Sequence, residues 1–278
     1  MTPATGLSGD PIHPHLPGEG FSGEEGVSPT ESPLGHPHGA EEDSARVPWS
    51  GRELSPSGFE TDAGEADPAL LAALSASADD AALMRAVEAS RFVVPVVAEP
   101  TQVDDSGEHT VEKQVDMAAV TLVAPDGQRA LPVFTGTTSL AAWDPTARPV
   151  PVTPSRAAQA AVSEGCDVMV IDVAGPATRV LRPSMVWALA QQRPWVPAHT
   201  DPFVDRSVAA AVRDEGDVTA YGLEEGRPPG EGVLGVVLDL RPGLAPHEVR
   251  EVATRVGERL ATDGELRARV DGLAFRIR

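Results

Sequence analysis

The stretch VMVIDVAGPATRVLRPSMVWALA, residues 168–190, decides the fold of this chain. Its first six residues are apolar except for one aspartate, and such a run is typical of a strand buried on both faces. A Gly-Pro pair at 175–176 predicts a turn, residues 178–181 predict a returning strand, and a Pro-Ser pair at 183–184 predicts a helix start. Strand, turn, strand and helix in this order indicate a mixed α/β domain.

Upstream patterns extend this domain back to Asp67, which with Pro68 predicts a helix N-terminus. Pro95 cannot donate a backbone hydrogen bond, so we expect the strand that contains it to be an edge strand or to carry a bulge. The strand at 150–152 and the helix that follows it predict a strand–helix–strand crossover into Val168. The other expected elements are a helix starting near Ser77, strands at 91–97, 117–123 and 129–134 with a turn at 124–127, and a helix at 137–143.

We expect a second module after this domain, because residues 195–202, WVPAHTDP, are typical of a linker. Residues 203–278 then predict helix, strand, strand, helix and strand, an α+β order. The sequence therefore predicts an α/β and α+β fold with a mixed sheet in its N-terminal domain. Its expected parts are a disordered acidic tail at 1–66, an N-terminal domain at 67–194, a linker at 195–202 and a smaller module at 203–278.

The net charge of −20 limits the classes of partner that this chain is expected to bind. Affinity for nucleic acid and for anionic membranes comes mainly from Lys and Arg, so we expect neither as a partner. The start of the chain carries no basic segment followed by an apolar one, and no apolar run is long enough to span a membrane. We therefore expect a cytoplasmic protein.

Residues 1–66 contain 9 Pro, 11 Gly, 12 acidic and 2 basic residues, which is −10 and half of the net charge. A segment with so few apolar side chains cannot offset the entropy of ordering, and we expect it to be disordered. Two His-Pro-His tripeptides, at 13–15 and 36–38, lie within it. Flexible imidazole pairs bind metals weakly, so we expect no metal site.

The counts of cysteine and lysine, and the context of one glycine motif, exclude several kinds of site. Cys166 is the single cysteine, which excludes an intramolecular disulfide and a cysteine-based zinc site. Lys113 is the single lysine, and no P-loop surrounds it. Residues 230–235, GEGVLG, match the dinucleotide fingerprint literally, but they leave a loop and enter a strand, whereas the fingerprint requires a helix after the glycines. We expect no cofactor and no catalytic residues.

Asp172 interrupts the apolar strand and is the least expected polar residue in the chain. A buried carboxylate must be hydrogen-bonded or ion-paired, and Arg179 or Arg182 across the predicted hairpin is the expected partner. The alternative is a ligand pocket at the end of the strand, lined by Asp172, Arg182 and Trp187, since α/β sheets commonly bind ligands there.

Two stretches carry a resemblance to a known family: LPVFTGTTSLAAW at 131–143 and VPVTPSRAAQAAVSEGCDVMVIDVAGPATRVLRP at 150–183. Their hydrophobic and turn positions resemble the SseB family of bacteria, named for enhanced serine sensitivity and distinct from the secretion-system protein of the same abbreviation. The likeness covers about residues 69–192, the family's N-terminal domain, and residues 203–278 resemble its looser C-terminal domain. The resemblance implies an α/β fold in a cytosolic bacterial protein and supplies no catalytic motif.

We therefore expect a non-enzymatic binding or regulatory protein that acts through protein contacts. The alternative is a protein or enzyme that binds a small, amino-acid-related metabolite in a pocket near Asp172. The sequence names neither the partner nor the ligand, and it leaves the oligomeric state open.

Overall fold

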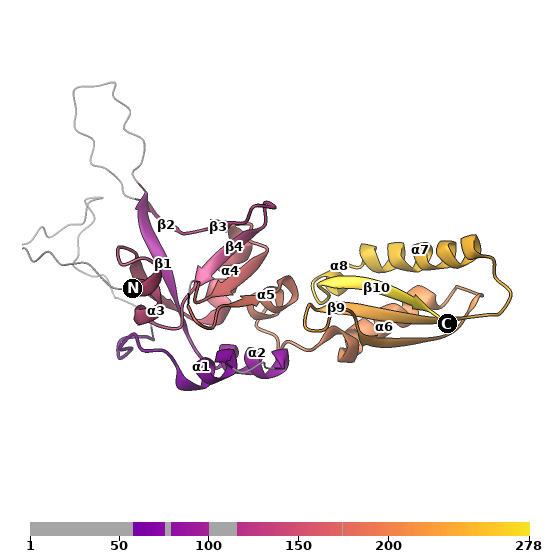
Figure 1. Ribbon diagram of the computed structural model, residues 1–278, viewed down its shortest axis with the longest axis horizontal. Helices are drawn as coiled ribbons and strands as arrows, with labels where there is room; N and C mark the ends of the chain where they lie inside the picture. Colours follow the sequence, from indigo (N-terminus) through magenta and orange to yellow (C-terminus); the bar gives the residue numbers. More distant parts are fainter. Residues whose placement is uncertain (1–57, 76–78, 100–115, 174) are drawn as a thin grey trace, which may run out of the picture. The chain divides into compact units, whose positions relative to one another are not determined.

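The computed structural model describes residues 58–75, 79–99, 116–173 and 175–278 (Figure 1). These residues belong to one compact unit that spans Leu54–Arg278, and they form a mixed α/β and α+β fold with two larger hydrophobic clusters and a small third one. The expected disorder of the tail and its His-Pro-His pairs lie outside the described residues, apart from residues 58–66.

The N-terminal part of the fold contains two small sheets. One has the order β2-β1-β5, and the other has the order β3-β4-β6-β7, with β4 and β6 parallel and the remaining pairs antiparallel. A bridge between Val93 and Phe134 joins the two sheets. Their strands are β1 Phe92–Glu99, β2 Asp116–Ala119, β3 Leu122–Val123, β4 Arg129–Val133, β5 Arg148–Val152, β6 Val168–Ile171 and β7 Arg179–Leu181.

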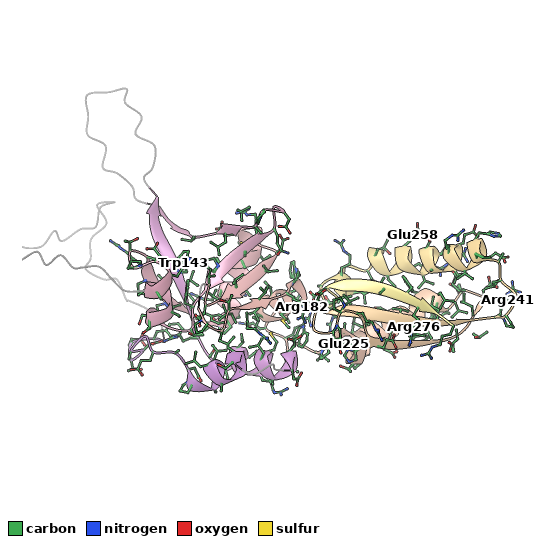
Figure 2. All side chains as sticks on the ribbon, viewed as in Figure 1. Trp143, Arg182, Glu225, Arg241, Glu258 and Arg276 are labelled. Carbon is green, nitrogen blue, oxygen red and sulfur yellow. The ribbon has the colours of Figure 1, made fainter. Side chains whose placement is uncertain are left out.

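Five helices accompany these sheets in the described residues, and two of them begin at local side-chain caps that are followed by a proline. The Asp67 carboxylate accepts a hydrogen bond from the backbone N–H of Ala69 at 2.7 Å, and Thr153 Oγ1 accepts one from Arg156 at 3.3 Å. Proline at the first helical position follows both caps, and the sequence predicts this start at Asp67 and Pro68. The helices are α1 Pro68–Ser75, α2 Asp80–Glu88, α3 Thr137–Trp143, α4 Pro154–Ser163 and α5 Pro183–Ala190. In Figure 2, Trp143 is labelled at the end of α3; its ring lies 5.3 Å from that of Phe134.

The C-terminal part is built on a three-stranded sheet of order β10-β9-β8, in which β9 is antiparallel to β8 and parallel to β10. Helices α6 and α7 bury Val204, Val208, Val252 and Val256 against it. No described helix combines the length and apolar composition needed to cross a membrane. The elements are η1 Ala198–Thr200, α6 Pro202–Val212, β8 Val218–Glu225, β9 Val233–Leu240, α7 Pro246–Thr262, α8 Gly264–Arg267 and β10 Gly272–Ile277.

The prediction that Pro95 places its strand at an edge or in a bulge is wrong. β1 is the central strand of its sheet, and its register with β5 runs without a shift through Pro95, which lies opposite Pro149. Neither proline has an N–H to donate, so the pair leaves no backbone donor unsatisfied between the strands. On the other side, β2 pairs with β1 from Val96 onward.

Two further expectations about strand pairing need correction. The strand expected at 117–123 is divided between β2, which pairs with β1, and β3, which forms the hairpin with β4. The parallel neighbour of β6 is β4 and not β5, so the crossover into Val168 starts from β4. Both differences concern pairing between distant segments, which periodicity does not report.

Ordered contacts begin before Asp67, where the sequence predicts the fold to start. Arg91 donates from Nη2 to the Asp62 carboxylate at 2.9 Å and to the Glu65 carbonyl at 2.6 Å. The hydrogen bond from Arg91 to the Asp62 carboxylate lowers the pKa of Asp62 to about 2. The guanidinium thus holds residues 62–65 against the domain, although the composition of this segment is that of the tail.

Glu215, which follows α6, is the buried acidic side chain of the C-terminal part that is paired with two arginines. Its carboxylate is 5% exposed and lies 2.7 Å from Arg255 Nη2 and 2.8 Å from Arg259 Nη1. The hydrogen bond from Arg255 lowers the pKa of Glu215 below its ordinary value of 4.5, and burial opposes this shift. Glu215 therefore contributes stability while it is ionised.

We predict that the free energy of unfolding falls as the pH drops below about 4.5, because Glu215 is then protonated in the unfolded chain before it is protonated in the folded one. The stability is present above 4.5 and is lost as the pH falls through the lower pKa of the folded state. Urea unfolding of the Glu215→Gln variant from pH 7 to pH 3 checks this. The difference from the parent chain should shrink toward low pH, and a constant difference would contradict it.

Candidate functional site

Arg182 occupies the junction between β7 and α5 and contacts three distant segments. Its Nε lies 3.0 Å from the Asp271 carboxylate, its Nη2 lies 2.9 Å from the Asp80 carboxylate, and its Nη1 donates to the Gly230 carbonyl at 2.7 Å. The side chain is 16% exposed. A guanidinium presents its donors in a rigid planar fork, so these three acceptors fix its orientation.

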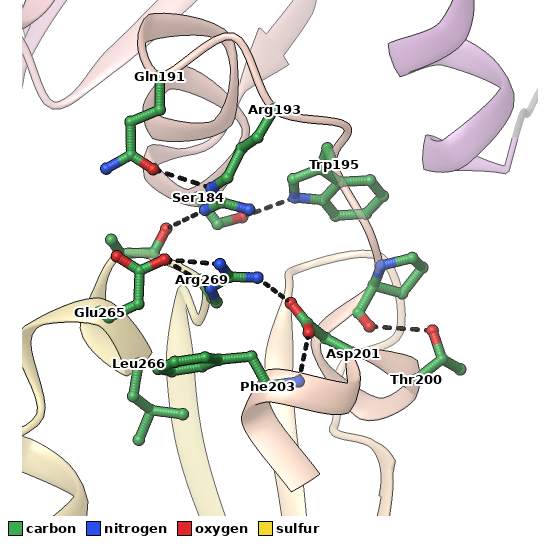
Figure 3. A network of polar contacts seen from close by, with 12 residues as sticks. Ser184, Gln191, Arg193, Trp195, Thr200, Asp201, Phe203, Glu265, Leu266 and Arg269 are labelled. Atoms are coloured by element: carbon green, nitrogen blue, oxygen red, sulfur yellow. Dashed lines mark hydrogen bonds and ion pairs between the residues drawn. The ribbon is translucent and has the colours of Figure 1, made fainter. Parts of the chain in front are cut away.

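Asp271 caps the N-terminus of α5 from outside that helix. The N-cap position is held by Arg182, whose side chain carries no acceptor. Asp271 accepts instead from the Ser184 N–H at 2.7 Å and from Ser184 Oγ at 2.8 Å. Trp195 Nε1 in turn donates to Ser184 Oγ at 3.1 Å (Figure 3). A carboxylate at this position satisfies free N–H groups and interacts favourably with the helix dipole.

Gly232 has a steric role beside this cluster. Its φ is +72°, and a Cβ there would lie 2.1 Å from Asp271 Oδ2 and 2.7 Å from Arg182 Nε. The residues of the GEGVLG motif do run from a loop into β9, as the sequence predicts. The glycine at 232 is required by the close approach of two charged side chains.

A second charged cluster lies around Arg269. Its guanidinium lies 2.8 Å from Asp201, 2.6 Å from Glu265 and 4.6 Å from the centre of the Phe203 ring (Figure 3). Burial lowers the pKa of Arg193 below its ordinary value, and the nearby positive charge of Arg269 lowers it further. The Arg269 guanidinium itself is held by two carboxylates.

A cavity of about 360 Å³ opens between the two clusters. This volume is at the lower end of the range for small-molecule sites. Its four carboxylates outnumber its two guanidinium groups, so the walls favour a ligand that brings an ammonium or other donor groups. The lining consists of Asp79, Asp80, Arg182, Ser184, Trp195, Pro197, Ala198, His199, Glu225, Gly230, Gly232, Val233, Arg269 and Asp271.

Of the three residues predicted to line a ligand pocket, only Arg182 lines this cavity. In the β6–β7 pair, Ile171 lies opposite Arg179 and Met169 lies opposite Leu181. Asp172 and Arg182 therefore follow opposite ends of the pair. Trp187 is 40% exposed on α5 and is not among the residues that line the cavity.

The expected ion pair from Asp172 to Arg179 or Arg182 is wrong for the residues that the structure describes. The Asp172 carboxylate accepts from the Thr135 N–H at 2.9 Å and from Thr135 Oγ1 at 2.8 Å. Asp172 has a φ of 49° and is 7% exposed, and its carbonyl accepts from Thr178 Oγ1 at 2.7 Å. Aspartate tolerates this left-handed conformation, so the residue makes the turn after β6 and ties it to the end of β4.

Asp80, Ser184, Asp271 and Gly232 were not predicted to lie at this site. Asp271 is 89 residues from Arg182, and Asp80 is 102 residues from it. A carboxylate near a predicted strand or helix end is common, and nothing in its local pattern indicates which arginine it contacts. The unusual Gly-rich segment before β9 was the one local signal of a close approach.

We predict that Asp172→Ala lowers the free energy of unfolding by about 3 kcal/mol, because it leaves the buried Thr135 N–H without an acceptor and places a methyl side chain at positive φ. Asp172→Asn should lose less than about 1 kcal/mol, since an amide keeps both hydrogen bonds and tolerates the conformation. Urea unfolding measures both. The exposed turn variant Asp126→Ala is the control, expected within about 0.5 kcal/mol of the parent; equal losses for Asp172→Ala and Asp172→Asn would contradict the assignment.

Comparison with known proteins identifies the N-terminal part of the chain. The family described as SseB protein N-terminal domain matches residues 68–188. This range begins at the first residue of α1 and ends within α5, so it contains both N-terminal sheets. No curated protein and no solved structure matches the chain. Residues 68–188 of the chain therefore form an SseB protein N-terminal domain.

Proposed function

We propose that this chain is a non-enzymatic cytoplasmic binding or regulatory protein that acts through protein contacts, and that the outer edge of β10 is its contact surface. The observation that carries the proposal is the open edge of this strand. In the described part of the chain, β9 is the strand that pairs with β10, and no strand pairs with the other side. Such an edge accepts an extended segment of a partner as an additional strand.

The backbone of β10 directs every second residue outward. Arg278 donates its N–H to Leu238 and accepts from Leu240, so both of its backbone groups are directed toward β9. Because the direction alternates along a strand, Leu273, Phe275 and Ile277 present their N–H and C=O groups to the open edge. These groups are available to a further strand.

Apolar side chains accompany this edge. Leu273 is 39% exposed and Ile277 is 37% exposed, and both lie on the face of the sheet to which Phe275 belongs. Leu273 also borders an apolar groove of about 240 Å³ between α7, α8 and β10. The groove is lined by Leu260, Ala261, Leu266, Arg267, Val270 and Leu273. Backbone groups would supply affinity here, and the groove would select an apolar side chain.

The opposite edge of the same sheet differs. β8 carries a register irregularity between Val218 and Ala220, and η1 packs beside it. Bulges and covering segments are common means by which proteins protect an edge strand from pairing. The contrast favours β10 as the interacting edge.

We predict that extended peptides selected from a display library against the full chain bind along β10. Binding should slow amide exchange at Leu273, Phe275 and Ile277, because these N–H groups become hydrogen-bonded. The Ile277→Pro variant should weaken binding by at least about tenfold, since it removes a donor that β9 does not use. Exchange followed by NMR measures the protection. Selected peptides that protect other segments, or that bind Ile277→Pro equally well, would contradict the surface.

A second candidate function is binding of a small, amino-acid-related metabolite, and the cavity beside Arg182 favours it. The cavity combines acidic walls with the aromatic side chain of Trp195. The alternative site expected near Asp172 has less support, because that carboxylate is buried and already accepts two hydrogen bonds from Thr135.

We predict that, if this second function holds, a thermal-shift screen of amino acids and small amines finds a stabilising ligand; at 100 times its dissociation constant a ligand adds about 2.7 kcal/mol. Two adjacent glutamates provide a matched pair. Glu225 lines the cavity and Glu224 does not, so Glu225→Gln should reduce the shift and Glu224→Gln should not. Equal effects of the two variants would contradict the site.

A further inference from the structure

We propose that β10 pairs with β10 of a second copy of this chain, antiparallel and about a two-fold axis that passes through Phe275. The inference rests on the proposed function, because it names the partner of the same edge. Two copies joined in this way form one continuous six-stranded sheet from two sheets of order β10-β9-β8. A contact between identical edges is closed by the two-fold axis, so it produces a dimer and not a fibre.

The backbone of β10 is compatible with this symmetry. The residues whose N–H and C=O groups face outward are Leu273, Phe275 and Ile277. A two-fold axis at Phe275 places Phe275 opposite itself and Leu273 opposite Ile277 of the second copy. In each of these pairs, the N–H and C=O groups of both residues face the opposite strand. The two residues of a pair therefore exchange two backbone hydrogen bonds.

The side chains in this register are complementary. Ile277 of the second copy lies beside Leu273, which borders the apolar groove. The exposed isoleucine of each copy thus meets the groove of the other, and the two-fold axis repeats the contact. Phe275 at the axis packs over Gly257 of α7, where a Cβ would lie 3.4 Å from its ring, so α7 presents no side chain at this point.

The charges of β10 also favour this register. Arg276, which is labelled in Figure 2, is the one charged residue within Gly272–Ile277. Its guanidinium is ion-paired with Glu224 of β8, on the far side of β9. A charged side chain commonly guards an open edge, but this one is held away from it. The axis at Phe275 sets Arg276 opposite Ala274 of the second copy.

Neighbouring registers are less favourable. An axis at Arg276 would set two arginines opposite each other, and like charges in this position are destabilising. An axis at Ala274 would set Ile277 opposite Asp271, whose carboxylate is 6% exposed and already bound by Arg182 and Ser184. Of these three registers, the axis at Phe275 is the one that sets neither two arginines opposite each other nor Ile277 opposite Asp271.

The oligomeric state of the full 278-residue chain tests the proposal. The monomer mass is 29.0 kDa, and sedimentation equilibrium in about 0.15 M salt, where the net charge is largely screened, should detect twice this mass as concentration rises. Leu273→Lys and Ile277→Pro should each raise the dimer dissociation constant by at least about tenfold. Val180→Lys is the matched control, because Val180 is 48% exposed on the edge strand β7 and should leave the constant unchanged.

Cross-linking tests the register without a disruptive substitution. Ala274 and Arg276 of the second copy form a pair without mutual hydrogen bonds, in which Cα atoms lie about 4.5 Å apart and a disulfide can form. An equimolar mixture of Ala274→Cys and Arg276→Cys chains should therefore give a disulfide-linked dimer under mild oxidation. Each variant alone should not, and the native Cys166 is buried.

The outcomes separate this inference from the proposed function. A monomer at every concentration, with peptides still protecting β10, overturns the self-pairing and leaves the proposed function standing. A monomer with no peptide protection at β10 overturns both. A dimer that persists in Leu273→Lys, or a cross-link in Ala274→Cys alone, overturns the interface or its register. Loss of the dimer with Leu273→Lys and not with Val180→Lys supports the inference.

Discussion

The guanidinium of Arg182 is the interaction on which the arrangement around the candidate cavity depends. It is held by the Asp80 and Asp271 carboxylates and by the Gly230 carbonyl, and it is largely removed from solvent. Removal of one partner of such a buried pair is costly, because the remaining charge stays in a poorly solvated place. The position of α2, the start of α5, the loop before β9 and the residue before β10 are therefore coupled through one side chain.

This coupling explains why α5 begins as it does. Proline at its first position has no N–H, and Arg182 before it has no acceptor, so the helix lacks a local cap. Asp271 supplies the missing acceptor, and Gly232 leaves the space that its carboxylate needs. The cap of one helix is thus provided from 87 residues away, and a glycine whose spacing matches a nucleotide motif serves steric access instead.

The sheet that contains β10 combines a protected edge with an open one. β8 is irregular and accompanied by η1, whereas β10 is regular and apolar on one face, and its Arg276 is ion-paired with Glu224 of β8. An edge of this kind usually carries a stability or aggregation risk unless another chain covers it. The proposed contact surface follows from this difference between the two edges. The register in which β10 of two copies can pair restricts which partner fits this surface.

The sequence by itself determined the features that depend on neighbours in the chain. Helix α3 has the predicted bounds, the cap at Asp67 is formed as expected, and the predicted turn between β3 and β4 has Gly127 at positive φ. Only the tertiary structure decided which strands pair, that Pro95 faces Pro149 within a central strand, and that Asp172 binds Thr135 while Arg182 binds Asp271. Caps and periodicity act over a few residues and are read locally, whereas a buried charge takes its partner from whichever distant segment the packing of the cores brings within about 3 Å.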